Sequence, residues 1–207
     1  MKPKQVVVVV SFLLPLLAVL SNLPIAFSDD APERVLDVMQ NPLETDRQYY
    51  ILPAIRGPAG GGLKLIKTGN SDCPLTVLQD QSEVYHGKSV KFTITGDNSE
   101  IRTGTILDIE FVNKPECAKS GKWGVLYDPQ IYNFCVVIDA LNSKFQIEKY
   151  RAGYKLMFCY DGGCLDIGRF DAENGESGRR LTPNAPEPFE IVFVEAFEDN
   201  KVIKSVV

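Results

Sequence analysis

Short apolar runs alternate with polar residues along most of the chain, and Gly, Pro, Asn or Asp separates the runs. Within many runs, apolar and polar residues alternate with a period of two, which is typical of strands that bury one face. After residue 28, no stretch keeps apolar residues at helical spacing over more than two turns. The pattern predicts twelve strands, at residues 48–54, 63–67, 75–79, 90–95, 106–112, 122–127, 134–139, 144–149, 154–160, 165–169, 179–182 and 189–197. Regular short strands of this kind indicate an all-β barrel or sandwich.

A weak internal repeat favours one of these architectures. Three similar segments open the repeats and three close them, at residues 49–52, 107–111 and 154–158 and at residues 90–94, 145–149 and 189–193. The openers lie 47–58 residues apart and the closers 44–55. Three units of four strands predict a β-trefoil with pseudo-threefold symmetry, in which six strands close a barrel and six cap it. A two-sheet sandwich is the alternative.

The first 28 residues have the pattern of a targeting segment. Lys2 and Lys4 precede an apolar run of about 15 residues, which is shorter than the ~20 that a membrane-spanning helix needs. Small residues, Ala26 and Ser28, stand before an expected cleavage site after Ser28. We therefore expect a secretory signal peptide at residues 1–28 and a single domain at residues 29–207. The mature protein is expected to be secreted, either extracellular or vacuolar, and free of the membrane.

The net charge and the histidine content make several classes of function improbable. The 22 basic and 27 acidic residues leave a net charge of −5, which argues against nucleic acid as a partner. The single histidine, His86, excludes multi-histidine metal sites and leaves few ways to build a Ser–His or Cys–His nucleophile. We therefore expect neither an enzyme nor a bound metal or cofactor.

Secretion would make disulfides the first interpretation of the five cysteines. Cys159 and Cys164 enclose an Asp-Gly-Gly reversal and are expected to pair. Cys73 and Cys117 each lie near a proline at a strand edge or loop, and we expect a second bridge between them. Cys135 lies within an apolar run and is expected to be a buried free thiol in a monomer. A disulfide dimer through Cys135 is the alternative.

Several segments resemble the plant Kunitz proteins, the family of soybean trypsin inhibitor. The chain has Val-Leu-Asp at 35–37, Asn-Pro-Leu-Glu at 41–44 and Tyr-Tyr-Ile-Leu at 49–52, followed by matches at 60–63, 73–77, 107–111, 122–125, 145–149, 154–159, 164–168 and 178–181. They occur in the family's order over nearly all of the expected mature chain. One departure is Gln40, where the family signature normally has Gly. The resemblance implies a β-trefoil, secretion, the same two disulfides and inhibition of an endopeptidase, usually a serine protease.

The resemblance also places an inhibitory loop between the fourth and fifth strands. Here the loop candidates are Gly96, Asp97, Asn98, Ser99, Glu100, Ile101 and Arg102. Counting back from residues 107–111 without gaps places Asp97 at P1, the residue that enters the protease specificity pocket, with Asn98 as P1′. Because the trypsin pocket ends in a carboxylate, an aspartate there predicts poor trypsin inhibition. A shifted register would make Arg102 the P1 residue, and a third alternative is that this loop is not the working surface.

The resemblance further implies a residue that supports the loop. The family often uses an N-terminal asparagine for this purpose, and the matching residue here is Thr45, whose single hydroxyl makes fewer hydrogen bonds. A loop without a basic P1 favours a serine protease other than trypsin, or a cysteine protease engaged through other loops. The rival hypothesis is a non-inhibitory trefoil that serves in storage or binds a ligand or protein.

Overall fold

A computed structural model describes residues 31–55, 60–96, 99–140, 144–171 and 175–196. The described residues from Pro32 onward belong to one compact unit. Its described part contains strands and no helix. The strands are β1 Tyr49–Pro53, β2 Leu63–Ile66, β3 Thr76–Asp80, β4 Val90–Ile94, β5 Leu107–Phe111, β6 Trp123–Asp128, β7 Asn133–Ile138, β8 Lys144–Tyr150, β9 Gly153–Tyr160, β10 Gly163–Asp166, β11 Gly168–Phe170, β12 Gly178–Thr182 and β13 Ile191–Glu195.

Six strands close an antiparallel barrel. Their order is β1-β4-β5-β8-β9-β13, and β13 pairs with β1 to complete the ring. Buried and less buried residues alternate along these strands, as in β1 and β5, so the period of two in the sequence turns one face inward. The inward side chains include Tyr49, Phe92 and Phe193, which pack at ring-centroid distances of 5.7–6.1 Å.

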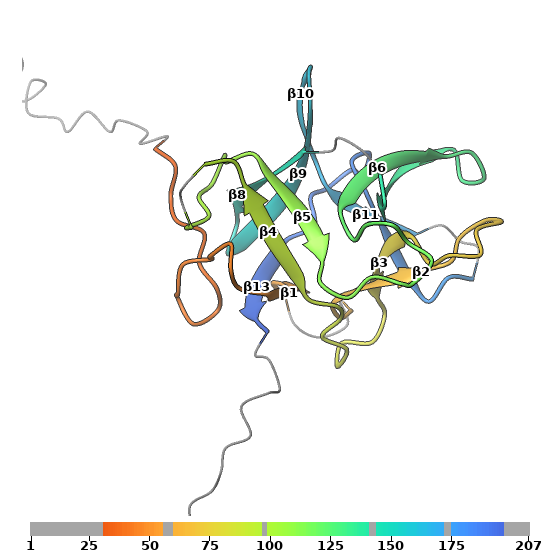
Figure 1. The fold of residues 1–207 in the computed structure, drawn as a ribbon, viewed down its shortest axis with the longest axis horizontal. Coiled ribbons are helices and arrows are strands. Elements are labelled where there is room, and N and C mark those ends of the chain that lie inside the picture. The colour runs from red at the N-terminus through yellow and green to blue at the C-terminus, as the bar shows by residue number, and fades with distance from the viewer. Residues whose placement is uncertain (1–30, 56–59, 97–98, 141–143, 172–174, 197–207) are drawn as a thin grey trace, which may run out of the picture. The chain divides into compact units, whose positions relative to one another are not determined.

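Three hairpins form the cap. They are β2–β3, β6–β7 and β11–β12, and they belong to a second sheet in which β3 contacts both of the other hairpins (Figure 1). One hairpin follows each of the barrel strands β1, β5 and β9 in the chain, which gives the threefold repeat. The prediction of a β-trefoil is therefore confirmed, and the sandwich alternative is wrong.

The number of strands differs from the prediction by one. The run predicted as a strand at 165–169 is divided into β10 and β11 at Ile167. β10 pairs with β9 in the barrel sheet, whereas β11 pairs with β12 in the cap, so the chain passes from one sheet to the other within this run. The structure consequently has thirteen strands over its described residues instead of twelve.

The cysteines are placed as expected from the sequence. Disulfides join Cys73 to Cys117 and Cys159 to Cys164, and Cys135 is a buried free thiol. Trp123 is also buried, packed against Phe111.

Candidate functional site

The segment between β4 and β5 runs back against residues 32–48, which precede β1 and are called the N-terminal segment below. In Figure 1 the orange N-terminal segment lies beside the green segment that precedes β5. Three residues meet there: Val35, Leu43 and Ile101. The Val35 amide donates to the Ile101 carbonyl (3.0 Å), the Ile101 amide to Leu43 (2.8 Å), and the Leu43 amide to Val35 (2.8 Å). The three backbones form a closed ring of hydrogen bonds, and all three side chains are fully buried.

We call residues 99–103 the outgoing limb of the loop, because they lead from its exposed part toward β5. On one side of the limb, the Thr45 amide donates to the Ser99 carbonyl (2.9 Å). On the other side, the Thr103 amide donates to the Glu33 carbonyl (2.8 Å), and the Glu33 amide donates to Thr103 Oγ1 (2.9 Å). The limb is therefore held extended between two parts of the N-terminal segment, in the strand-like form that a protease cleft accepts.

Two arginines flank the carboxylate of Glu100. Arg34 Nε lies 3.0 Å from Glu100 Oε2, and Arg102 Nη2 lies 3.6 Å from the same oxygen. Arg102 Nη1 also donates to the Pro32 carbonyl at 3.1 Å. The guanidinium of Arg102 is thus engaged with the protein itself, which argues against Arg102 as a free P1 side chain.

The other loop candidates have different positions. Gly96 and Ser99 are exposed, and Gly96 has a φ of 113°, a backbone conformation that favours glycine where the loop leaves β4. Ile101 points into the core and anchors the limb instead of facing a partner. Asp97 and Asn98 lie outside the described residues, so their assignment as P1 and P1′ stays a prediction. Thr45 contributes a backbone amide to the limb, as described above.

Two buried tyrosines fasten the N-terminal segment to the barrel. The Tyr49 hydroxyl accepts the Glu44 amide and the Tyr154 hydroxyl accepts the Leu36 amide, each at 2.9 Å. Burial raises the pKa of Tyr49, which keeps its hydroxyl neutral. Sequence reasoning missed both roles, although each tyrosine opens a strand of the predicted repeat.

A strained turn lies between the two parts of the N-terminal segment. Asp37 is buried, and its Oδ1 accepts the amides of Met39 and Asn41 at 2.8 Å. Gln40 has a φ of 66°, in the left-handed region that glycine adopts most easily. The departure from the expected glycine therefore falls on a position where the backbone needs one.

Comparison with known proteins supports this architecture. The family model described as trypsin and protease inhibitor, of the legume Kunitz type, matches residues 35–195. The chain belongs to the plant Kunitz family of protease inhibitors. It is 49% identical over 203 residues to the Kunitz-type trypsin inhibitor-like 2 protein of Pisum sativum, covering 91% of this chain and 93% of that protein.

Two further relatives show the range of the Kunitz family. Subtilisin inhibitor CLSI-II of Canavalia lineata is 45% identical over 186 residues, covering 83% of this chain and 96% of that protein. The crystal structure of a Kunitz-type trypsin inhibitor from Cicer arietinum superposes with a TM-score of 0.75 at 49% identity, covering 80% of this chain and 99% of that one. The resemblance found in the sequence is confirmed.

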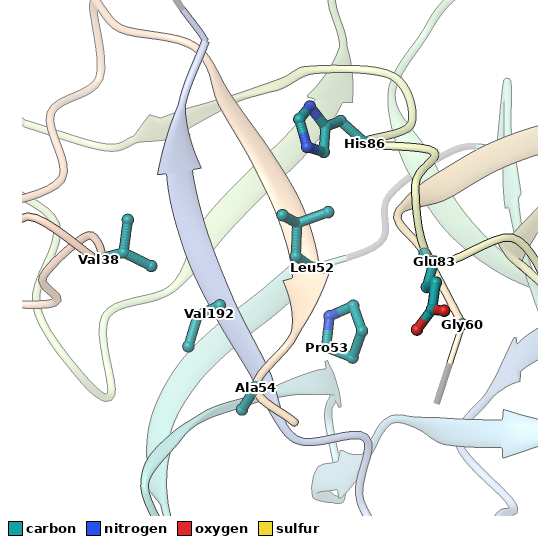
Figure 2. A pocket seen from close by; sticks show the side chains of 9 residues that line it. Val38, Leu52, Pro53, Ala54, Gly60, Glu83, His86 and Val192 are labelled. Atoms are coloured by element: carbon teal, nitrogen blue, oxygen red, sulfur yellow. The ribbon is translucent and has the colours of Figure 1, made fainter. Parts of the chain in front are cut away.

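This Kunitz protein also has a surface pocket away from the limb. Its volume is about 340 Å³, and its lining includes Leu52 of β1, Val192 of β13, Val38, Glu83 and His86. Figure 2 shows the aliphatic side chains around the pocket, with Glu83 and His86 as its ionisable groups. Of the loop candidates that the structure describes, none lines the pocket. The pocket is within the size range of small-ligand sites, which begins at roughly 300 Å³.

A buried ionic cluster fixes the β6–β7 hairpin of the cap to β12. Arg180 is almost fully buried; its Nη1 lies 2.5 Å from Asp128 Oδ2 and its Nη2 lies 2.6 Å from Glu176 Oε1. Burial alone would lower the pKa of Arg180, but its hydrogen bonds to Glu176 and Asp128 raise it above the ordinary value. Arg180 Nη1 also approaches Cys135 Sγ at 3.7 Å. We therefore assign the cluster a structural role, which is to hold the two cap hairpins together.

Two further findings concern only the part of the chain that the structure describes. Within the described ranges, no group of three or more His, Cys, Asp or Glu side chains is arranged to hold a metal ion. Those same ranges contain no helix of the length and apolarity that a membrane span requires.

Proposed function

We propose that this protein is a secreted, reversible inhibitor of serine endopeptidases and has no catalytic activity of its own. It acts through the loop between β4 and β5 and selects proteases whose specificity pocket does not require a basic side chain. The proposal is carried by the anchored limb: Ile101 is buried within a closed ring of backbone hydrogen bonds, while Ser99, two residues earlier, is exposed. A loop held in its bound shape loses little entropy when it binds.

The expected selectivity follows from the charges of the loop. Arg102 is engaged with Pro32 and Glu100, and the remaining loop candidates include no other basic residue. An acidic P1 would meet the carboxylate of the trypsin pocket as a like charge. The relative from Canavalia lineata is named as a subtilisin inhibitor, which supports a subtilisin-type target.

An equilibrium titration tests the proposal. The chain from Asp29 would be titrated, with its disulfides intact, against trypsin, chymotrypsin, elastase, subtilisin and papain. We expect 1:1 inhibition of subtilisin, weak inhibition of trypsin and only a severalfold loss of subtilisin inhibition in Arg102→Ala, because Arg102 supports the limb through exposed contacts and does not enter the protease pocket. Asp97→Lys should gain trypsin inhibition if Asp97 is P1. The matched control is Lys122→Ala, which removes an exposed cation that pairs with Asp108 on the barrel.

Two results would contradict the proposal in different ways. Strong trypsin inhibition that disappears in Arg102→Ala would make Arg102 the P1 residue. Inhibition of papain alone would point to a cysteine protease and to other loops.

A non-inhibitory, ligand-binding function is the second candidate, and the pocket beside β1 and β13 is the observation in its favour. Absence of inhibition across the whole panel would favour this candidate. The pocket would then be examined by following the NMR signals of His86, the single histidine, during ligand screening.

A further inference from the structure

The first residues of the folded unit run along the outer side of the limb. Pro32 and Glu33 offer their carbonyl groups to the side chain of Arg102 and the amide of Thr103, at 3.1 and 2.8 Å. Arg34 reaches the carboxylate of Glu100 at 3.0 Å. Every residue from 32 to 34 thus contacts the limb through at least one polar atom.

We propose that residues 32–34 are positioning residues of the inhibitory loop, so that the exact N-terminus of the mature protein sets the strength of inhibition. This inference rests on the proposed function. It identifies a part of the inhibitory site that lies about 65 residues before the loop in the sequence.

The two sets of contacts hold different parts of the limb. The ring of Val35, Leu43 and Ile101 fixes the middle of the limb, and its side chains are buried. Residues 32–34 hold the end of the limb beyond the ring, at Arg102 and Thr103, and they neutralise Glu100 on the exposed face. Removing them leaves the ring able to form but without support from the end of the limb, so the ring opens more often at Ile101 and the loop becomes less preorganised while the barrel stays folded.

The ion pair of Arg34 and the backbone contacts of Pro32 and Glu33 should contribute differently to the strength of inhibition. Arg34 and Glu100 form an ion pair in which the Arg34 side chain is 56% exposed. Such pairs contribute little, so Arg34→Ala in the full chain should raise the inhibition constant only about two- to fivefold. Arg34→Lys should recover part of that loss. Loss of the backbone contacts of Pro32 and Glu33 as well should raise the constant at least about tenfold, because misplacement of a bound segment is costly.

The test compares the chain from Asp29 with a chain that begins at residue 34 and carries Arg34→Ala. The first measurement is the inhibition constant for a protease that the longer chain inhibits, together with the rate at which that protease cleaves the loop. The second is amide hydrogen exchange at Ile101, with the amide of Phe92 in β4 as the barrel reference. The control is Lys122→Ala, whose side chain is 53% exposed and also forms an ion pair.

The expected result is weaker inhibition, faster loop cleavage and faster exchange at Ile101, with exchange at Phe92 unchanged in the shortened chain. An unchanged inhibition constant in a chain that otherwise inhibits overturns the positioning role and leaves the proposed function intact. A longer chain that inhibits nothing overturns the proposed function. Unchanged exchange at Ile101 overturns the positioning role whatever the longer chain inhibits.

Discussion

The two disulfides close loops of very different length, and this difference predicts their contributions to stability. Cys73 and Cys117 are separated by 44 positions, whereas Cys159 and Cys164 are separated by 5. A cross-link removes entropy from the unfolded chain, and the effect grows with the logarithm of loop length. At 25 °C the relation gives about 4 kcal/mol for the longer loop and about 2 kcal/mol for the shorter one. Replacing the first pair by alanine should therefore lower the free energy of unfolding by about 2 kcal/mol more than replacing the second pair.

Urea unfolding of the two double-alanine variants measures this difference. The chain has one tryptophan, Trp123, which is buried in the described structure, so its fluorescence reports unfolding of the core. Burial of the cysteines works against the prediction, because Cys159 is more buried than Cys73. Equal losses, or a larger loss for the 159–164 pair, would refute the argument that loop length decides which disulfide contributes more. Neither disulfide supplies a contact to the limb, so inhibition at 25 °C should survive in both variants.

Three further predictions concern single residues. Gln40→Gly relieves the left-handed backbone at that position and should raise the free energy of unfolding by about 0.5–1 kcal/mol in urea unfolding, whereas Gln40→Ala should not. Cys135 is buried, and burial raises the pKa of its thiol, so iodoacetamide should label it only after unfolding; labelling of the native protein would contradict this. Burial works to raise the pKa of Asp128, but hydrogen bonds from Arg180 and the Gln130 amide lower it overall. Its contribution is therefore present above the ordinary pKa of about 4 and is lost as the pH falls further, so Asp128→Asn should flatten the acid limb of a plot of stability against pH.

The strands were predictable because their signals are local. Alternation with a period of two and the Gly, Pro, Asn and Asp residues between runs are properties of neighbouring residues, and each predicted run overlaps an observed strand. The exception, at residues 165–169, shows the limit of such signals. There the Ile167 amide donates to the Leu156 carbonyl of the barrel, while Gly168 pairs with Thr182 of the cap. The division of the run depends on two partners that are distant in the sequence, so no local pattern indicates it.

The position of the loop in the sequence was predictable, but the contacts that support it were not. Polar and glycine residues at 96–100 indicate an exposed loop, and the resemblance to the Kunitz family gives it a function. The support of the loop comes from hydrogen bonds between backbone groups of Val35, Leu43 and Ile101, and backbone groups carry no side-chain signature in a sequence. The one local signal was Ile101, a β-branched apolar residue between two charged ones. Its isolation among polar residues is what a buried anchor inside an exposed loop requires.

The difference between local sequence signals and contacts with distant parts of the chain also bears on the choice between Arg102 and Asp97 as P1. From the sequence, Arg102 is a basic residue in an exposed segment, which is the composition of a trypsin-directed loop. A P1 side chain must also be free to leave its own protein, and this depends on contacts made elsewhere in the chain. Pro32 and Glu100 engage the Arg102 guanidinium, and the strand pairing on both sides fixes the backbone beneath it. An arginine that holds the loop in place is poorly suited to enter the protease pocket, so the residues before Ser99 become the stronger candidates for P1.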